Sequence, residues 1–592
     1  MKKSLTLLLC GLVCLATIAG CETSPNVPDG TDSTNSTDNT ASSESDGSTE
    51  VQATVINVTE DWGITPGQGY GKANSLIFAQ KLLSVPDNTE IRFPEGTYEI
   101  AFPIYLLEKK QISLIGENAT VLRTDVTNTS ATQSPMDDPD IPEDIRAYTA
   151  SSSIFVINGC QGVTVQGFTL GYDIPTSLSG TVLSKDGGSV VLEIADTAQF
   201  TGEEYATIIN TFTKQGVPDK KLEQYAAANF PLEKLSDTTL RVTGLDAGGV
   251  SNLTKGTRVC LRLSTASDYV INVGNSTDMV FENITMHNSL NGGIIIGDRC
   301  QNATLQNVTV KPQNEQSLMS LNADILHISA LGGSLNVENC HFERPGDDCV
   351  NVHDMAYVVD RVSGNTATVS APRFSFSSTW AKAGDEIDFY DGETFAYLGR
   401  ATVTQTDENT YTFDALPNGV SAGTVISNAS MHPAVTIKNT TVQSNRARGF
   451  LLQTENVLVE NCTFKDTALA AILLAPDLEY WYEMAPAKNV VIRNNTFENC
   501  GEYALGIIQI ATNHDDPSKT YSSYIHQNIT IENNSFDAGH KNAVYGVCID
   551  SLTFRDNDFS NSRNQRVTLK YCKNVKLDEQ TSQNSTLTDI TE

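Results

Sequence analysis

Three aspartates on two segments of the chain are spaced so that they could share one catalytic site. The first segment runs from Asn322 through Asp324 to His327, and the second is Gly346-Asp347-Asp348-Cys-Val-Asn351-Val-His353. The stretch between them reads as one rung of a solenoid, and one coil of a parallel β-helix would stack Asp324 about 4.8 Å from the Asp347–Asp348 pair. A carboxylate cluster of that kind is what acid and base hydrolysis of a sugar acetal requires.

The direction of the Asp348 side chain depends on where its strand begins. In an extended strand Val350 and Val352 face the core, and Asp348 falls on the same side. If the strand begins after Asp348, both carboxylates of the pair can face one cleft. Like charges one coil apart raise the pKa of at least one carboxyl group, which places a proton donor beside ionised bases. The alternative is that these residues only decorate solenoid turns for solubility or calcium.

Short alternating strands that end in an Asn turn recur along the chain, as in Met279-Val-Phe-Glu-Asn283 and Val457-Leu-Val-Glu-Asn461. Their period of roughly 20 to 40 residues indicates a solenoid, and an apolar period of two excludes an α-helical one. Val, Ile and Phe are predicted to point into the coil. Each Asn is predicted to occupy a bend, where it tolerates the left-handed conformation and can hydrogen-bond its neighbours in the stack. The sequence therefore predicts an all-β protein built on a parallel β-helix.

Two stretches, residues 177–265 and 356–428, interrupt the repeat and read as inserted small antiparallel β-barrels. The second begins directly after the aspartates, and a long insertion beside a site usually shapes it. Coils of the β-helix are then expected over residues 53–176, 266–355 and 429–592. A short amphipathic helix in the first of these ranges is expected to cap the open N-terminal end.

The N-terminus is typical of a bacterial lipoprotein. Residues 1–20 combine Lys2-Lys3 with an apolar run, and Ile18-Ala-Gly-Cys21 resembles a lipobox whose Cys21 becomes the lipidated N-terminus. Residues 21–52 are rich in Ser, Thr and Asp and predict a flexible tether. We therefore expect an extracytoplasmic protein that is anchored by lipid to the bacterial cell membrane, at the cell surface.

The chain is strongly acidic, with a formal net charge of −32 and a pI near 4.5. Phosphate binding requires a basic face, so nucleic acid is not an expected partner and a neutral glycan fits better than an anionic one. Among the 12 cysteines, Cys340 and Cys462 occupy the same position in their rungs. This recurrence predicts a stacked, half-buried column and not a disulfide framework. No Cys or His spacing indicates zinc, and neither a metal nor another cofactor is expected.

The aspartate blocks, together with two later blocks, resemble glycoside hydrolase family 110, the exo-acting α-1,3-galactosidases. The later blocks are Asn445-Arg-Ala-Arg448-Gly-Phe and the segment from Ala470 to Trp481-Tyr-Glu483. The resemblance covers most of residues 55–575, including both insertions. It implies a right-handed parallel β-helix of the pectate-lyase-like superfamily and an inverting enzyme that removes terminal α-1,3-linked galactose from oligosaccharides. Blood group B-type glycans, linear α-galactosyl caps and algal galactans all stay open as substrates, as does the oligomeric state.

The resemblance also implies roles for particular residues. By further analogy with the family 28 polygalacturonases, which use three aspartates, Asp347 is the general acid, and Asp324 and Asp348 position and deprotonate water. Carboxylates about 6.5–9.5 Å apart would admit that water, a spacing that the offset of one coil and the splay of the side chains could give. Trp481 would stack on galactose, with a packing role as the alternative. The hydroxyl groups of the sugar would meet Asn351, His353, His327, Arg448 and Glu483, and for the two histidines a structural role behind the site is the alternative.

Two other classes of protein remain as alternatives. One is another β-helix enzyme, similar to a polygalacturonase or a polysaccharide lyase. The Gly-His-Gly and Arg-Ile-Lys motifs of family 28 do not occur in this chain, and three aspartates fit water activation better than lyase chemistry. The other is a non-enzymatic surface β-helix that binds glycans, which would explain the tether and the acidity but not the aspartate spacing.

Overall fold

The computed structural model describes residues 53–124, 143, 146, 151–194, 205–263, 268–373, 377, 379–512, 523–539, 541–562 and 566–591. The predicted signal segment, the tether and Cys21 lie outside the described residues. Within the described part of the chain, no helix has the length and hydropathy needed to cross a membrane.

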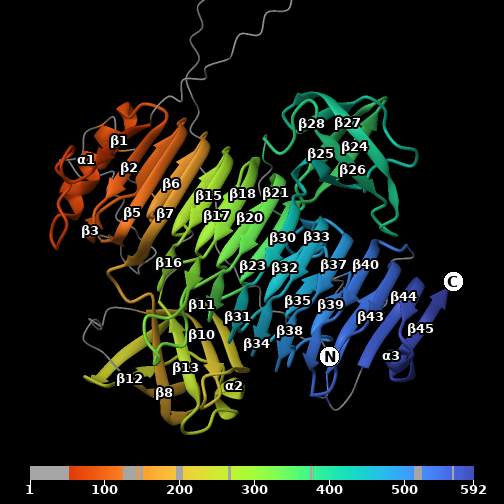
Figure 1. Ribbon diagram of the computed structural model, residues 1–592. Helices are drawn as coiled ribbons and strands as arrows, with labels where there is room; N and C mark the ends of the chain where they lie inside the picture. The colour runs from red at the N-terminus through yellow and green to blue at the C-terminus, as the bar shows by residue number, and fades with distance from the viewer. Residues whose placement is uncertain are drawn as a thin grey trace, which may run out of the picture.

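Most of the described chain winds into a parallel β-helix whose strands form three stacks (Figure 1). The first stack contains β4 (Ile104–Leu107), β6 (Phe155–Asn158), β14 (Ile271–Gly274), β17 (Ile294–Gly297), β20 (Leu326–Ser329), β23 (Val350–Met355), β32 (Phe450–Leu452), β35 (Ile472–Leu474), β39 (Ile508–Ile510) and β42 (Asn542–Val547). This is the stack that carries the predicted site.

The second stack contains β2 (Thr89–Phe93), β5 (Lys110–Arg123), β7 (Gln161–Tyr172), β15 (Thr277–Glu282), β18 (Cys300–Gln306), β21 (Leu331–Glu338), β30 (Ala434–Lys438), β33 (Glu455–Glu460), β37 (Lys488–Arg493), β40 (His526–Glu532) and β43 (Ile549–Arg555). The third contains β16 (Thr285–Met286), β19 (Thr309–Val310), β22 (His341–Glu343), β31 (Thr441–Gln443), β34 (Thr463–Lys465), β38 (Thr496–Glu498) and β41 (Ser535–Asp537). The coil ends with β44 (Arg566–Leu577), α3 (Glu579–Gln583) and β45 (Ser585–Thr591).

Asn turns set the bends of the coil, as the sequence pattern predicts. Asn283 and Asn307 have φ values of 53° and 54°, in the left-handed region that Asn tolerates. The Nδ2 of Asn307 donates to Oδ1 of Asn283 at 3.0 Å, one coil away. Inside the coil, aromatic rings stack in the same register: Phe464 and Phe497 lie 5.0 Å apart, and Phe497 and Phe536 lie 4.9 Å apart. Turn and core therefore repeat together.

The predicted cysteine column differs from the structure in two ways. Cys340 and Cys462 are fully buried, not half-buried, because their side chains turn inward at the bend. They are also separated by Thr440, whose Oγ1 accepts from the backbone N–H of Cys340 at 3.4 Å. Asn495 and Asn534 then continue the column, with Oδ1 of Asn534 accepting from Nδ2 of Asn495 at 3.0 Å. The column is therefore a mixed polar ladder inside the bend.

Replacing Asn495 with Ala is expected to lower the free energy of unfolding by about 1–3 kcal/mol, because buried backbone groups lose their partners. Oδ1 of Asn495 accepts from Cys462 N–H at 2.8 Å, and its Nδ2 donates to the Val459 carbonyl at 3.0 Å. Denaturant titration checks the loss. The exposed amide Gln527 is the control, and equal small effects for Asn495→Ala and Gln527→Ala would contradict the ladder's importance.

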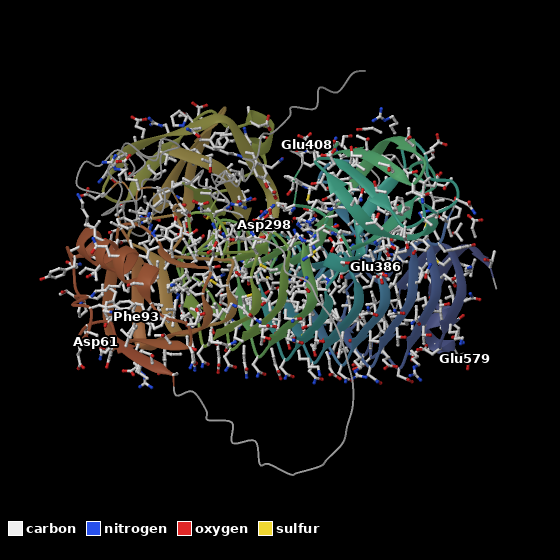
Figure 2. All side chains as sticks on the ribbon, turned by 90° about the horizontal axis from the view of Figure 1, so that it is seen from above. Asp61, Phe93, Asp298, Glu386, Glu408 and Glu579 are labelled. Atoms are coloured by element: carbon white, nitrogen blue, oxygen red, sulfur yellow. The ribbon has the colours of Figure 1, made fainter. Side chains whose placement is uncertain are left out.

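Both insertions are closed antiparallel barrels. The first contains β8 (Ser177–Asp186), β9 (Ser189–Ile194), β10 (Tyr205–Phe212), β11 (Pro218–Ser236), β12 (Thr239–Val242) and β13 (Arg258–Arg262), with α2 (Ala247–Ser251) beside them. The second contains β24 (Tyr357–Ser363), β25 (Thr366–Ser370), β26 (Glu386–Tyr390), β27 (Tyr397–Asp407), β28 (Thr410–Phe413) and β29 (Val425–Asn428), and η3 (Ala429–Met431) follows. Figure 2 shows both barrels on the same side of the coil. The predicted fold class is confirmed.

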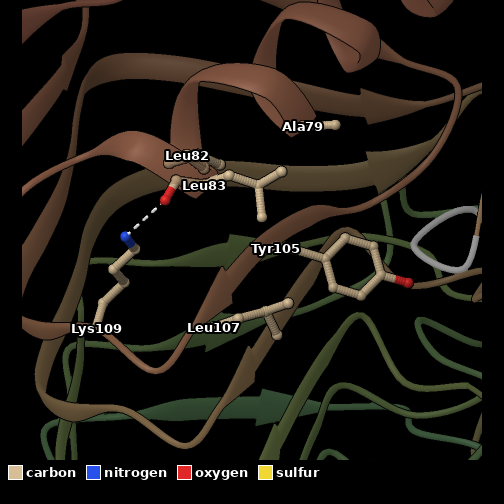
Figure 3. Close-up of a pocket in the computed structure, with 6 residues that line it drawn as sticks. All are labelled: Ala79, Leu82, Leu83, Tyr105, Leu107 and Lys109. Carbon is tan, nitrogen blue, oxygen red and sulfur yellow. Dashed lines mark hydrogen bonds between the residues drawn. The ribbon is translucent and has the colours of Figure 1, made fainter. Parts of the chain in front are cut away.

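The N-terminal end of the coil is covered by α1 (Gly71–Ser84), with β1 (Thr54–Asn57) and β3 (Gly96–Ile100). Between this helix and β4 lies a small, mainly apolar pocket (Figure 3), lined by Ala79, Leu82, Leu83, Tyr105, Leu107 and Lys109. The ammonium of Lys109 donates to the Leu83 carbonyl at 3.0 Å. This pocket lies at the capped end of the coil, several coils from the aspartates. None of its six lining residues carries a carboxylate.

Candidate active site

One turn in three successive coils carries the central residues. Asp324 precedes β20, the Asp347–Asp348 pair precedes β23, and Arg448 precedes β32. These three strands pair in parallel, so the turns before them stack. Gly346 makes the close approach possible, because a Cβ at this position would lie 2.2 Å from the carbonyl oxygen of Asn322.

The three aspartates meet at one place. One carboxylate oxygen from each of Asp324, Asp347 and Asp348 lies within 4.8 Å of those from the other two. The strand begins at Val350, after the pair, so the condition for a shared cleft is met. The separation of about 6.5–9.5 Å between the acid and base carboxyl groups is a different quantity from this closest approach of single oxygens, and it stays a prediction.

Two arginines from the turn before β32 neutralise the cluster. The Nε of Arg448 donates to Oδ1 and Oδ2 of Asp348 at 2.8 and 3.0 Å, and its backbone N–H donates to Oδ1 at 2.9 Å. Arg446 places its Nη1 3.7 Å from Oδ1 of Asp347 and donates to the Gly346 carbonyl at 2.6 Å. Because these guanidinium groups already supply positive charge, a metal ion is not needed to hold the three carboxylates.

The pair of aspartates differs in electrostatics. Burial raises the pKa of Asp348 to about 7, and the charges of Asp347 and Asp324 add to the rise that Arg448 opposes. Burial would also raise the pKa of Asp347, but Arg446, Arg448, Arg262 and Lys220 together hold it below its usual value. The Asp347 side chain is 38% exposed, whereas Asp348 is 1% exposed. The site thus holds an open, ionised carboxylate beside a buried carboxyl group of raised pKa.

Asp324 is fixed from two sides. Its Oδ1 accepts from the backbone N–H of Asp348 at 2.9 Å, and its Oδ2 lies 2.7 Å from Nδ1 of His327. The other ring nitrogen of His327 lies 3.0 Å from Nε2 of His353. The hydroxyl of Tyr269 lies 3.2 Å from Nδ1 of His327. The two predicted histidines therefore lie behind the aspartates as one connected group.

Glu483 reaches the same place from a later coil. It lies on β36 (Glu483–Met484), which pairs antiparallel with the end of β23, and its Oε1 is 3.6 Å from Nε2 of His353. Burial raises the pKa of Glu483 to about 7, Asp477 and Asp324 add to the rise, and His327 and Arg448 oppose it. The site therefore contains a second carboxyl group that can hold a proton near neutral pH.

Trp481 stands in the loop before Glu483 and is 39% exposed. Its ring packs edge-on against Tyr480 at 4.8 Å, and the guanidinium of Arg373 lies 3.3 Å from the Tyr480 ring centre. Arg373 belongs to the second barrel, so that barrel contacts the loop that carries Glu483. Oδ1 of Asp477 accepts backbone N–H bonds from Tyr480 and Trp481 at 2.8 and 3.2 Å, which gives this loop a defined shape.

The first barrel also reaches the cluster, which the sequence analysis did not predict. On β11, Glu223 pairs with Arg446, and the Nζ of Lys220 lies 3.4 Å from Oε2 of Glu223. Arg262 on β13 donates to the carbonyls of Asn322 and Gly346 at 2.6 and 2.5 Å. Arg446 belongs to the Asn445-Arg-Ala-Arg448 block on which the family resemblance rests. The barrel residues Lys220, Glu223 and Arg262 lie in no such block, and only the fold brings them to the aspartates.

Asn351 lies on β23 in register with His327 of β20 and is 6% exposed. Its Oδ1 is buried and has no hydrogen-bond partner among the described residues. The structure thus brings Asp324, Asp347, Asp348, Arg448, His327, His353 and Glu483 into contact with one another, and it places Asn351 beside them. Trp481 lies at the neighbouring surface.

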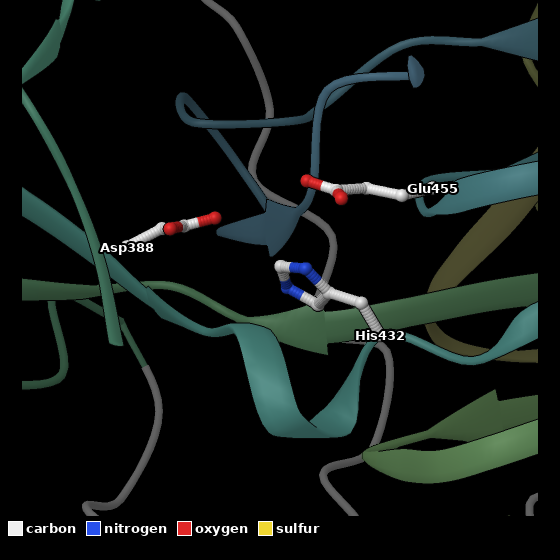
Figure 4. A group of neighbouring side chains, drawn as sticks. All are labelled: Asp388, His432 and Glu455. Carbon is white, nitrogen blue, oxygen red and sulfur yellow. The ribbon is translucent and has the colours of Figure 1, made fainter. Parts of the chain in front are cut away.

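A separate group of titratable side chains, Asp388, His432 and Glu455, lies where the second barrel meets the coil (Figure 4). The Nε of Arg400 donates to Oδ1 of Asp388 at 2.7 Å, and the Nζ of Lys488 donates to Glu455 at 2.7 Å. Burial lowers the pKa of His432 to about 4. Each carboxylate already has a cationic partner, so this group joins the barrel to the coil through ion pairs.

The fold and the site define a parallel β-helix protein with a carboxylate–arginine site shaped by two inserted barrels. The family model described as right handed beta helix region matches residues 384–516. A solved structure titled as a family 28 exopolygalacturonase of Yersinia enterocolitica aligns with 91% of this chain and 78% of its own, at 13% identity and a TM-score of 0.41.

The curated relatives are named as α-1,3-galactosidases. Alpha-1,3-galactosidase A of Akkermansia muciniphila is 32% identical over 43% of this chain and 43% of its own length. Alpha-1,3-galactosidase B of Bacteroides thetaiotaomicron is 24% identical over 89% of this chain and 91% of its own. The resemblance to α-1,3-galactosidases on a β-helix fold is therefore confirmed.

Proposed function

We propose that this protein is a glycoside hydrolase that releases terminal α-1,3-linked galactose from glycans, with inversion of the anomeric centre. The observation that carries the proposal is the cluster of Asp324, Asp347 and Asp348, with oxygens within 4.8 Å of one another. Hydrolysis of an acetal needs one carboxyl group to protonate the leaving oxygen and one carboxylate to activate water. The names of the relatives support the galactosyl linkage.

The roles of the aspartates follow from their surroundings. Asp324 is held by a backbone N–H and by His327, which suits a carboxylate that takes a proton from water. Asp348, whose pKa is raised to about 7, holds the proton that the cluster shares at neutral pH. Asp347 is the exposed member of the cluster and remains our choice of group facing the leaving oxygen. In each turnover Asp347 gives a proton to the leaving oxygen and Asp324 takes one from the attacking water, and exchange with solvent returns a proton to Asp347.

Substrate contacts are proposed for the groups at the rim of the cluster. Asn351 offers a buried Oδ1 with no hydrogen-bond partner among the described residues, which suits a sugar hydroxyl. Glu483 and Arg448 offer further hydrogen-bonding groups, and the exposed face of Trp481 suits the apolar face of galactose. The lipid anchor at Cys21 and the cell-surface location remain proposals from the sequence.

The proposal is tested by galactose release from Gal-α-1,3-Gal and from the fucosylated blood group B trisaccharide. We expect release from at least one of them, and the ratio of kcat/KM values gives the preference for a branched or a linear glycan. The hydrolase proposal is contradicted if the folded wild-type protein binds either glycan without releasing galactose and the Asp347→Asn variant binds that glycan with the same affinity. That result would favour a glycan-binding protein.

Lys220 offers a test of the first barrel's part in the site. Lys220→Ala is expected to move the basic limb of the kcat/KM profile to higher pH, because one of the four cations that lower the pKa of Asp347 is lost and the acid keeps its proton further up the pH scale. The pH profile of kcat/KM measures the change. Lys221, which is 46% exposed and paired with Asp219 at 3.0 Å, is the matched control. Identical profiles for Lys220→Ala and Lys221→Ala would exclude a role of the barrel in tuning Asp347.

A further inference from the structure

His327 contacts the cluster through both of its ring nitrogens. Nδ1 lies 2.7 Å from Oδ2 of Asp324, and Nε2 lies 3.0 Å from Nε2 of His353. The His327 side chain is 20% exposed, and His353 is 3% exposed. His327 therefore lies between a reacting carboxylate and a buried imidazole, with little surface left for a sugar.

The hydrogen-bond partners determine where the protons lie. Nδ1 of His353 lies 3.3 Å from the carbonyl oxygen of Asp354, which can only accept, so the proton of a neutral His353 is on Nδ1. Its Nε2 is then an acceptor, and Nε2 of His327 must donate to it. Nδ1 of His327 faces a carboxylate at 2.7 Å and donates as well. Both ring nitrogens of His327 carry a proton, which makes the ring an imidazolium.

The surroundings favour this charge. The groups that face His327 are Asp324 on its own turn, Tyr269 before β14, Asp348 before β23, His353 on β23 and Glu483 on β36. Burial alone would lower the pKa of His327, but the hydrogen bond and the charge of Asp324, with Glu483 and Asp348, raise it above its usual value. Burial and the neighbouring His327 lower the pKa of His353 to about 3, so His353 stays neutral.

We propose that His327 is a positioning residue whose imidazolium, held by His353, donates to the Asp324 carboxylate and keeps it aimed at the reacting water. Of the two roles expected for the histidines, this selects the structural one over sugar binding, and it names Asp324 as the group through which they act. Asp324 is then fixed by two donors, His327 at Oδ2 and the Asp348 N–H at Oδ1. Its remaining lone pairs are free to accept a proton from water. The kinetic part of this inference rests on the proposed hydrolytic function.

Kinetics of two variants separate positioning from sugar binding. His327→Ala is expected to lower kcat about 10- to 100-fold with KM changed less than about 3-fold, since the lost contact acts on a reacting group. The acidic limb of the kcat/KM profile should move to higher pH, because the group that receives the proton from water loses its neighbouring cation. His327→Asn restores a neutral donor near Nδ1, so it should recover part of kcat while the profile stays shifted.

The matched control is His341→Asn. His341 also faces a carboxylate, with its Nε2 3.4 Å from Oε2 of Glu343, but it lies on β22 and its side chain is 35% exposed. Its variant should reproduce the wild-type pH profile. A His327→Ala variant that raises KM with an unshifted pH profile would overturn the proposal and return His327 to sugar binding.

A measurement that needs no substrate keeps the inference testable if the variants do not fold or if the wild type releases no galactose. Nitrogen-15 NMR of histidine-labelled wild-type protein should show one buried imidazole with both nitrogens protonated at pH 7, joined through its Nε2 hydrogen bond to a neutral imidazole. His432 and His526, whose pKa values burial also lowers to about 4, lie outside this pair. The spectrum of the His341→Asn variant lacks the His341 signal, which identifies that signal in the wild-type spectrum. A neutral His327 ring at pH 6 would overturn the proposal, whatever the activity.

Discussion

Asp347→Asn is expected to reduce kcat/KM at least about 1000-fold while the protein stays folded. General acid or base catalysis by a positioned side chain contributes about 10²–10⁴-fold, and Asp347 is the exposed carboxylate of the cluster. Asn has the same shape as Asp, so the fold should tolerate the change. The Nη1 of Arg446 and the Nη2 of Arg448 lie 3.7 and 3.9 Å from Oδ1 of Asp347 in the wild type. Initial rates of galactose release measure the loss, and thermal unfolding of the same sample checks the fold.

The control is Asp278→Asn, at an exposed bend of the coil. Oδ1 of Asp278 accepts from Nδ2 of Asn302 at 2.9 Å, a bond that an Asn oxygen preserves, so activity should be unchanged. α-Galactosyl fluoride then tests the role, because fluoride leaves without a proton. If Asp347 is the acid, Asp347→Asn should hydrolyse the fluoride with little loss. Retention of more than a tenth of the wild-type activity on the disaccharide would contradict a catalytic Asp347.

Arg448→Leu is expected to lower the free energy of unfolding by about 3–5 kcal/mol near pH 8, because it leaves the carboxylate of Asp348 buried without its charged partner. Arg448 gives Asp348 two side-chain contacts and one backbone bond, and Asp348 is 1% exposed. The double variant Asp348→Asn, Arg448→Leu should recover much of the loss. Denaturant titrations of the wild type, the single variants Arg448→Leu and Asp348→Asn, and the double variant form a double-mutant cycle that measures the coupling.

The Arg448→Leu loss should depend on pH. The pKa of Asp348 is raised to about 7 in the folded protein against about 3.9 in an unfolded chain, so the folded state binds more protons between these values. The contribution of Asp348 to stability therefore falls as pH rises through this window, and without Arg448 the fall should extend to higher pH. Arg493→Leu, which breaks an ion pair with Glu460 on the coil surface, should cost less than about 1 kcal/mol. Equal losses for the two arginine variants would contradict the account of Asp348.

The fold could be predicted because its signals are local and repeat. Apolar residues at a period of two set the strands, and Asn283 and its counterparts in other rungs set the bends through φ values that few residues adopt. The aspartate spacing could also be interpreted, since one coil of known length brings Asp324 to Asp347 and Asp348. The two barrels were predicted because their strands break the rung pattern.

The remaining features depend on contacts between distant segments. Lys220, Glu223 and Arg262 reach the cluster because the first barrel folds back onto the coil, and no spacing in the sequence encodes that approach. The protonation of the aspartates depends on how many cations surround each of them, and Arg446 and Arg448 set the charge of Asp347. The surroundings of the carboxylates depend on the same distant contacts, since Arg446 and Arg448 approach Asp347 and Asp348 from the next coil.

Proton NMR of Gal-α-1,3-Gal hydrolysis tests the central claim most directly, because it reports the reaction and its stereochemistry together. The account predicts that the anomeric signal of β-galactose appears first and that the α anomer follows only by mutarotation. The Asp347→Asn protein in the same buffer should show neither signal. Initial release of α-galactose would contradict inversion, and the absence of release from either the linear or the fucosylated glycan by folded wild-type protein would contradict the proposed galactosidase.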